Sequence, residues 1–460
     1  MSAVKSLTKG SPAKLIFMFA LPLMLGNVFQ QFYTITDSLI ISRSLGMNAL
    51  SALGSADWYD YMIISIIQAA GQGFAILMAQ QFGAGNDKAL QKTIAHSLIL
   101  VTIITVLTTV VSVGSLDLVI SLLKTPAEIA PMTKEYLFFK FSGLAMAMLL
   151  NYCSAVLRAF GNSRTPLFAM VMAAFVNIGL DLLFVPVLGF GIKGAAIVTV
   201  IAQGCGGLVC LLTMLKLSCF HPSKEDFRPV EGLHVRLLAL CVPMMIQNMM
   251  ISGGGMIIQS RVNLNPLTFI AGYTATNKLY AALELAAVAY GFAMVTYIGQ
   301  NSGAHQYRRV RRGFFDAIWI AIATSAVIAV TIIVLRYPLT NMFLNGEGES
   351  VVEAGIYARR YLVILNLGLP ILYVLHIARC TLQGFGDTVT PMISGLAELA
   401  GRVATVFFGV SIFGTDAFFL AEIAAWIASD LVLVGKLVRS FKNLPKEDEP
   451  MVNTYEQTEF

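Results

Sequence analysis

Long runs of apolar residues alternate with short polar connections along almost the whole chain. Each run approaches or exceeds the roughly 20 residues that a helix needs to cross about 30 Å of hydrocarbon. The first six runs lie at 15–41, 61–81, 94–114, 137–157, 166–186 and 192–216, and the second six at 237–258, 271–298, 314–335, 361–382, 391–413 and 418–438. The pattern therefore predicts an all-α membrane protein with twelve transmembrane helices.

The second half of the chain repeats the first at a nearly constant spacing. Residues 157–166 (LRAFGNSRTP) are matched by 382–391 (LQGFGDTVTP) at an offset of 225, and residues 20–27 (ALPLMLGN) by 241–248 (CVPMMIQN) at an offset of 221. Between these anchors, Gly73 begins GFA and is followed by QQFGA at 80–84, while Gly291 begins GFA and is followed by QNSGA at 300–304. Because six is an even number, both halves enter the membrane from the same side, which predicts two parallel six-helix repeats.

The repeat and the charges between the runs predict the organisation of the chain. We expect an N-terminal six-helix lobe at 1–216, a cytoplasmic linker at 217–235, a C-terminal lobe at 236–442 and a disordered polar tail at 443–460. In the predicted connections, 20 Lys and Arg residues lie on the side of the N-terminus and six on the other side. The positive-inside rule therefore predicts that both termini of this multi-pass plasma-membrane protein are cytoplasmic.

Composition narrows the class of function. Hydrophobic residues make up 57% of the chain and charged residues 12%, against roughly a quarter charged in soluble domains. The net charge of +5 follows membrane sidedness, so we expect a lipid bilayer and no nucleic acid as partner. The six cysteines show no CxxC pair, and no GxxxxGK[ST] or HExxH motif occurs, so we expect no cofactor, no structural metal and no enzyme activity. Two six-helix lobes favour a transporter, which we expect to be a monomer.

Several motifs, in order along the chain, are similar to those of a known family. They are Leu21–Pro22–Leu23 with Asp37, the stretch 80–85, RAFGNSRTP at 158–166, Asn177-x-x-x-Asp181, GAAIVTVIAQ at 194–203 and QNSGA at 300–304. Together they resemble the multidrug and toxic compound extrusion (MATE) transporters, closer to the DinF-like bacterial branch, over residues 14–442. The resemblance implies a V-shaped two-lobe bundle. It also implies an antiporter that exports amphipathic, often cationic small molecules in exchange for H⁺ or Na⁺ by alternating access.

Two acids inside the predicted helices of the first lobe are candidates for ion coupling. A charge at a helix centre costs at least ~2.5–3.5 kcal/mol on insertion scales, so Asp37 and Asp181 need a reason to be there. Tyr33 lies one turn before Asp37 and Asn177 one turn before Asp181. Two such carboxylates can share a proton or hold a Na⁺ ion. The DinF-like resemblance implies that this pair is the coupling site, with Thr199 as an oxygen neighbour. The alternative is a pair of buried acids that clamp helices without titrating.

Polar residues of other helices are candidates for a substrate cavity between the lobes. The first helix carries a polar stripe that includes Asn27, Gln30, Gln31 and Thr34, and the seventh contains Gln247, Asn248 and Ser252 but no acid, unlike NorM-like members of the family. Lys278 and Glu284 lie in the eighth helix. Glu398 and Arg402, spaced i,i+4 in the eleventh, either face the cavity or form a locking ion pair inside the lobe.

Two other functions remain open from the sequence. A flippase for lipid-linked oligosaccharides would share this architecture, but acids beside Arg402 and Lys278 disfavour a polyanionic lipid. A membrane scaffold that transports nothing would also share it, and the acids of the first lobe argue against that reading.

Overall fold

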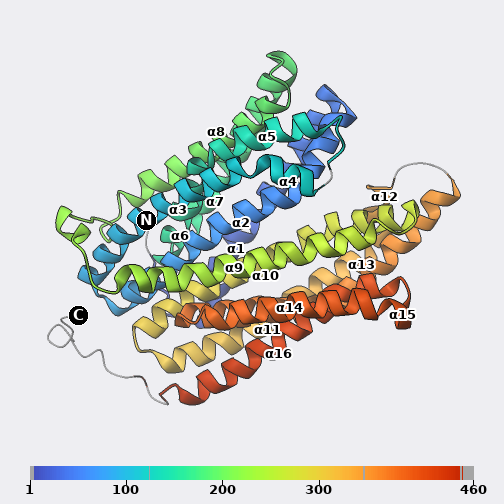
Figure 1. The fold of residues 1–460 in the computed structure, drawn as a ribbon. Helices are drawn as coiled ribbons and strands as arrows, with labels where there is room; N and C mark the ends of the chain where they lie inside the picture. The colour runs from blue at the N-terminus through green and yellow to red at the C-terminus, as the bar shows by residue number, and fades with distance from the viewer. Residues whose placement is uncertain (1–4, 124, 345–347, 446–447, 449–460) are drawn as a thin grey trace.

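The computed structural model describes residues 5–123, 125–344, 348–445 and 448, and in these the chain forms helices and no strand (Figure 1). The helices of the first half are α1 (Pro12–Leu45), α2 (Met47–Ala84), α3 (Asp87–Gly114), α4 (Leu116–Leu122), α5 (Ala130–Ser142), α6 (Leu144–Ala159), α7 (Arg164–Leu182), η1 (Leu183–Val187) and α8 (Gly191–Met214). After the short turn η2 (Lys224–Phe227), the second half contains α9 (Leu233–Val262), α10 (Leu267–Gly303), α11 (Tyr307–Val334), α12 (Arg336–Asn341), α13 (Glu349–Phe385), α14 (Val389–Phe408), α15 (Val410–Phe413) and α16 (Asp416–Asn443).

The predicted twelve-helix architecture is confirmed. Among the described residues, ten helices are long and apolar enough to cross a membrane, and α5 with α6 forms an eleventh span bent by 50°. Helix α14 corresponds to the eleventh predicted helix and supplies the remaining, twelfth span, in which Glu398 and Arg402 interrupt the apolar sequence. The run at 137–157 is therefore two helices that meet at a bend, with Gly143 between them.

The helix predicted at 166–186 also changes form near its end. Helix α7 stops at Leu182, and the wider π-helical turn η1 follows, with Pro186 inside it. Proline has no N–H to donate and its ring clashes with the carbonyl four residues earlier, so a regular α-helix cannot continue through this point. The turn begins two residues after Asp181 and so lies beside a candidate ion ligand.

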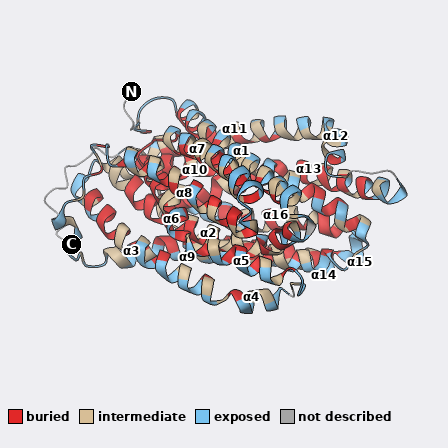
Figure 2. Ribbon diagram, turned by 90° about the horizontal axis from the view of Figure 1, so that it is seen from above, coloured by how far each residue is buried: buried red, intermediate tan, exposed pale blue. Residues whose placement is uncertain are grey.

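The helices form two lobes of related build. The amino-lobe consists of α1–α8 and the carboxy-lobe of α9–α16; the lobes meet where α2 contacts α9 and α10, and where α1 contacts α10 and α11 (Figure 1). We call the end of the molecule where α1 begins and where α2 and α10 end the N-terminal face, and the other end the opposite face. Buried residues run through the interior of the bundle (Figure 2), whereas large apolar side chains such as Phe175 and Trp319 are 68% and 71% exposed on the outside. An apolar outer surface of this kind suits lipid.

The connection between the lobes is held against α3. Gln91 of α3 donates a hydrogen bond to the carbonyl of Cys219 (3.1 Å) and accepts one from the N–H of His221 (3.0 Å). The predicted limits of the lobes and of the linker remain predictions, and most of the predicted disordered tail lies outside the described residues.

The structure corrects one equivalence of the repeat. A Cβ on Gly83 would overlap the backbone of Gln300, and a Cβ on Gly303 would overlap the backbone of Gln80. These reciprocal contacts fix the offset between α2 and α10 at 220, and both helices run without a break through the glycines in question. Gly291 is therefore the counterpart of Gly71, at an offset of 220, and not of Gly73 as the shared letters GFA indicate. The shared sequence GFA gives the wrong equivalence, because the packing of the helices, and not the local sequence, determines where a glycine is needed for close contact.

Candidate functional site

Two carboxyl groups from different helices meet inside the amino-lobe. Asp37 of α1 is 8% exposed and Asp181 of α7 is 0% exposed, and the two carboxyl groups are electrostatic neighbours. An ionised carboxylate only accepts hydrogen bonds, so a bond between two carboxyl groups requires a proton on one of them. Such a shared proton is the arrangement in which the two acids can lie side by side without repelling each other.

The surroundings of this pair leave several polar atoms unsatisfied. Within the described part of the chain, Oδ1 of Asp37, both carboxylate oxygens of Asp181 and both amide atoms of Asn177 are buried without a hydrogen-bond partner. Such atoms are rare in folded proteins because each one lost its water without a replacement. Four of the five are oxygens, which are the ligand atoms that a hard cation such as Na⁺ prefers. The residues present therefore fit either a proton or a Na⁺ ion.

The two other predicted ligands differ in their placement. Tyr33 has Asp37 and Lys140 among its electrostatic neighbours, which places it beside the acid pair. Thr199 of α8 is 6% exposed, and its hydroxyl donates to the carbonyl of Ala195 (3.0 Å). No hydrogen bond between Thr199 and either acid occurs among the described residues.

A lysine that the sequence analysis did not include lies close to the acid pair. Lys140 of α5 pairs with Asp60 of α2 (2.8 Å), donates to the hydroxyl of Tyr136 (3.2 Å) and is an electrostatic neighbour of Asp37. Its position inside the apolar run 137–157 was the available signal, because a cation within such a run needs a partner.

The carboxy-lobe holds a continuous network of buried ion pairs. Glu398 of α14 accepts from Arg379 of α13 (2.6 Å) and from Arg402 (3.2 Å), and Arg402 also pairs with Glu422 of α16 (2.7 Å). These contacts place Glu398 and Arg402 in an ion pair inside one lobe, which was the alternative to a position facing the cavity. The count of 20 positive residues in the connections on the side of the N-terminus includes Arg379, and this placement is wrong. Arg379 lies within the apolar run 361–382, which is part of α13, and is 8% exposed inside the bundle.

Two predicted cavity amides bridge the lobes. Asn27 of α1 donates to the carbonyl of Leu285 in α10 (3.3 Å), and Asn248 of α9 donates to the carbonyl of Ser65 in α2 (3.0 Å). Ser252 donates to the carbonyl of Asn248 (2.9 Å) and is fully buried.

The other predicted cavity residues range from fully buried to exposed. Gln247 is 2% exposed, and a Cβ on Gly395 of α14 would overlap it, so it packs inside the carboxy-lobe. Gln30, Thr34 and Lys278 are exposed, whereas Gln31 is half-buried. Glu284 is half-buried and lies 3.4 Å from Nε2 of His376.

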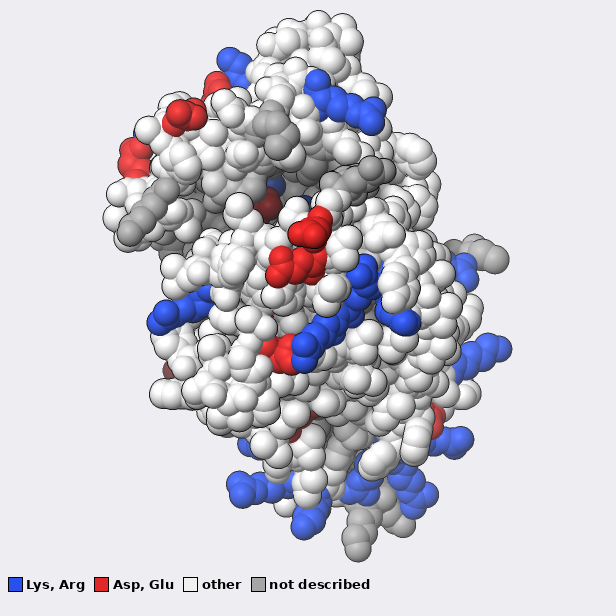
Figure 3. Space-filling view, turned by 90° about the vertical axis from the view of Figure 1, so that its right-hand side faces the viewer, with Lys and Arg blue, Asp and Glu red and all other residues white. Residues whose placement is uncertain are grey.

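A recess opens between the lobes toward the opposite face. Tyr61 of α2 is 55% exposed, yet its electrostatic neighbours include Glu284, Glu398 and Arg402 of the other lobe. Asp57, one turn earlier, is exposed and has Lys278 of the carboxy-lobe among its neighbours. Figure 3 looks onto this end and shows a recess with acidic and basic atoms at its floor. Side chains that are exposed but surrounded by the partner lobe indicate a solvent-filled space between the lobes.

Two parallel repeats around a recess, with buried charges at helix centres, define the architecture of a secondary transporter. The family model MatE matches residues 22–183 and 243–404, once in each repeat. The chain therefore belongs to the MatE (MATE) family of membrane transporters, and it is not an enzyme.

Similar proteins agree with this assignment. The probable multidrug resistance protein YpnP of Bacillus subtilis is 32% identical over 303 residues, which are 66% of this chain and 68% of that protein. The probable multidrug resistance protein YoeA of the same organism is 26% identical over 416 residues, 88% of each chain. Proteins named NorM (Thermotoga maritima) and DNA damage-inducible protein F (Escherichia coli) each match at 24% identity. A MOP superfamily transporter from Pyrococcus furiosus has the same fold, with a TM-score of 0.89 over 96% of this chain and 98% of that one at 21% identity.

Proposed function

We propose that the protein is a secondary active exporter that exchanges a small molecule for H⁺ or Na⁺ at Asp37 and Asp181. The observation that carries the proposal is the cluster of buried, unsatisfied oxygens that α1 and α7 bring together. Coupling needs a site whose stability changes when an ion binds, and buried acids whose described oxygens lack hydrogen-bond partners meet that need. Because α1 also contacts α10 and α11 of the other lobe, ion binding at Asp37 has a direct route to the contact between the lobes.

The recess supports an amphipathic, cationic substrate. Tyr61 offers an exposed aromatic ring, and Asp57 and Glu284 offer carboxylates on facing lobes. An aromatic ring and an acid together suit a cation with an apolar body. The relatives YpnP and YoeA are named probable multidrug resistance proteins, and these names point in the same direction.

The orientation follows from charge. Lys9, Lys14 and the arginines of the stretch 308–312 (RRVRR) lie at the N-terminal face, in agreement with the sequence count of positive residues. We therefore place the N-terminal face in the cytoplasm and the recess toward the outside. In this arrangement the described conformation is open to the outside and closed to the cytoplasm.

The test is efflux of a fluorescent cationic dye from proteoliposomes under a pH gradient or a Na⁺ gradient imposed separately. We expect one gradient to drive export by the native protein. Asn in place of Asp37 keeps the size of the side chain but binds neither a proton nor Na⁺ as a carboxylate does, so Asp37→Asn should lose gradient-driven export.

The matched control is Asp117→Asn. Asp117 is an acid with 80% of its side chain exposed and a pair to Lys134 outside the bundle, so its loss should leave export unchanged. Both variants should elute as single folded species in detergent. Normal gradient-driven export by Asp37→Asn would refute the proposed coupling site.

A further inference from the structure

Two amide side chains join the lobes at positions that the repeat makes equivalent. Asn27 bonds to the carbonyl of Leu285, and Asn248 bonds to the carbonyl of Ser65. The donors are 221 residues apart and the acceptors 220 residues apart. Each hydrogen bond is therefore the repeat image of the other, and each runs from one lobe to the other.

A second reciprocal pair lies near the N-terminal face. Gln80 at the end of α2 donates to the carbonyl of Gly384 (2.9 Å), and Gln300 at the end of α10 donates to the carbonyl of Ala159 (2.7 Å). Here the donors are 220 residues apart and the acceptors 225. We call Asn27, Asn248, Gln80 and Gln300 the amide clasp.

The backbones also close together at the outer pair of the clasp. A Cβ on Gly83 would overlap the backbone of Gln300, and a Cβ on Gly303 would overlap the backbone of Gln80. Helices α2 and α10 thus cross in direct backbone contact, one turn beyond each glutamine. Such an approach leaves no passage between these two helices at this face.

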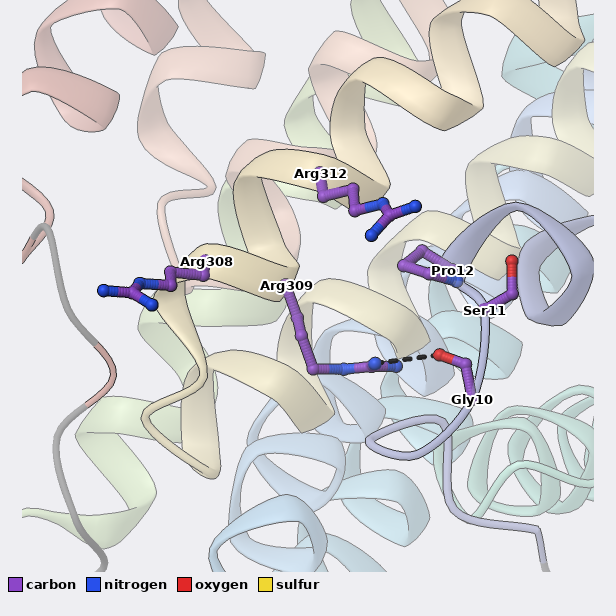
Figure 4. Close-up of a pocket in the computed structure, with 6 residues that line it drawn as sticks. All are labelled: Gly10, Ser11, Pro12, Arg308, Arg309 and Arg312. Carbon is purple, nitrogen blue, oxygen red and sulfur yellow. Dashed lines mark hydrogen bonds between the residues drawn. The ribbon is translucent and has the colours of Figure 1, made fainter.

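The amino-terminal segment (residues 5–11) covers only one half of the clasp. Leu7 is 1% exposed; its N–H donates to Oε1 of Gln300 (2.8 Å), and its carbonyl accepts from Asn301 (3.3 Å) and from Arg309 (3.2 Å). Figure 4 shows Arg309 donating to the carbonyl of Gly10, at 2.8 Å. No hydrogen bond from the described part of the segment reaches Gln80, so the segment makes the two halves of the clasp unequal.

We propose that the amide clasp is the gate that closes the cytoplasmic side of the transporter, and that the amino-terminal segment is a latch on its Gln300 half. The orientation, and with it the word cytoplasmic, rests on the proposed function. The four amides are positioning residues: they bond to backbone carbonyls of the other lobe, so all four bonds must break before the lobes separate at this face. Gln300 makes two contacts: its amide N–H donates to the carbonyl of Ala159, and its Oε1 accepts from the N–H of Leu7. Arg309 holds the segment in place through the carbonyls of Leu7 and Gly10.

A native cysteine reports on the gate. Cys241 of α9 is fully buried where a Cβ on Gly73 of α2 would overlap its backbone, so it lies at the contact between the lobes. In a variant that keeps Cys241 and replaces the other five cysteines, a membrane-permeant maleimide should react slowly. Gln80→Ala should raise this labelling rate by about fivefold, because one weak hydrogen bond is lost from the closed state. Gln300→Ala should raise it more, because the latch is released as well.

Matched variants separate the gate from general loosening. Gln259→Ala removes an amide of α9 that bonds to Asn263, the residue that directly follows this helix. Arg312→Gln removes an exposed arginine beside Arg309 whose described ion pair is with Asp316. Both should leave the labelling rate unchanged. Arg309→Gln should raise the labelling rate of Cys241 when the amide clasp is otherwise intact. It should add little to the effect of Gln300→Ala, because both substitutions release the same latch.

A second reporter guards against unfolding. Cys210 is fully buried inside the amino-lobe, so a variant that keeps only this cysteine should stay unlabelled as long as the lobe is folded. If Gln300→Ala exposes Cys210, this variant has partly unfolded, and the labelling of Cys241 in Gln80→Ala and Arg309→Gln then tests the gate. Unchanged labelling of Cys241 in folded Gln80→Ala and Gln300→Ala proteins would overturn the proposal. The assay needs no ion gradient, so it can fail or succeed independently of the transport test on Asp37.

Discussion

The two lobes differ in how their buried charged side chains are partnered. In the amino-lobe, Asp37 and Asp181 lie together with oxygens that have no hydrogen-bond partner among the described residues. The repeat offsets of 221 and 225 place Ile258 and Val406 at the equivalent positions of the carboxy-lobe. These residues are 2% and 4% exposed, so aliphatic packing occupies the place of the acid pair.

The carboxy-lobe carries its charges elsewhere and pairs them. Arg402 occupies the position equivalent to Asn177 and forms ion pairs with Glu398 and Glu422, and Arg379 completes the network. A buried acid without a partner costs folding free energy, whereas ion pairs between buried charges offset part of their desolvation. The network is not fully satisfied, because Nε of Arg379 and Nε of Arg402 are buried without a hydrogen-bond partner. In the proposed function, the acid pair of the amino-lobe binds the coupling ion, whereas aliphatic side chains fill the equivalent position of the carboxy-lobe.

The largest effect should follow from replacing the two acids of the amino-lobe by the aliphatic residues that stand at the equivalent positions of the carboxy-lobe. The double substitution Asp37→Ile and Asp181→Val should reduce gradient-driven export to below about a tenth of native, because the buried acid pair of the proposed coupling site is removed. The same protein should unfold at a higher temperature, because unsatisfied buried acids are replaced by apolar groups. Dye efflux and thermal unfolding in detergent measure the two effects. Retained export in the double variant would contradict the comparison.

An intermediate effect should follow from breaking the network. Glu398→Gln leaves Arg379 and Arg402 with one charged partner fewer inside the bundle, which should lower the free energy of unfolding by ~3–5 kcal/mol. Chemical unfolding of the purified protein measures this loss. Glu353→Gln, at an exposed acid of α13, is the control and should change stability little. Equal stability of the two variants would show that the network does not stabilise the lobe.

The smallest effect should follow from Thr199→Val. The hydroxyl of Thr199 donates to a carbonyl of its own helix, and Val has the same shape, so the ion concentration for half-maximal export should change by no more than about twofold. The measurement is export at a series of imposed Na⁺ or H⁺ concentrations. A much larger shift would identify Thr199 as a direct ligand.

The sequence predicted the architecture well because its signals are local. Apolar runs, the repeated stretches at 157–166 and 382–391, and the acids at Asp37 and Asp181 could each be read without knowing which helices meet. The amides were harder to interpret. Asn27 and Asn248 were predicted to line the cavity, whereas the structure shows each of them bonded to the other lobe. Their presence at equivalent positions of both repeats was the missed signal.

The paired charges could not be predicted in the same way. Arg379 and Glu422 lie on helices far apart in the chain, and only tertiary packing brings both to Glu398 and Arg402. The ion pair between Lys140 and Asp60 likewise joins α5 to α2. Sequence spacing indicates pairs within one helix, such as Glu398 with Arg402, but not pairs between helices.

The reciprocity of the amide clasp also bears on how such a chain is assembled. In a two-fold symmetric dimer, residue i of one subunit contacts j of the other, and j contacts i. The four cross-lobe hydrogen bonds follow this rule, so a homodimer of six-helix subunits would form all of them with one asparagine and one glutamine per subunit. The interface between the lobes therefore has the form of a subunit interface joined within one chain. Leu7 donates a hydrogen bond to Gln300, and no described hydrogen bond joins it to Gln80, so Leu7 marks where that symmetry ends.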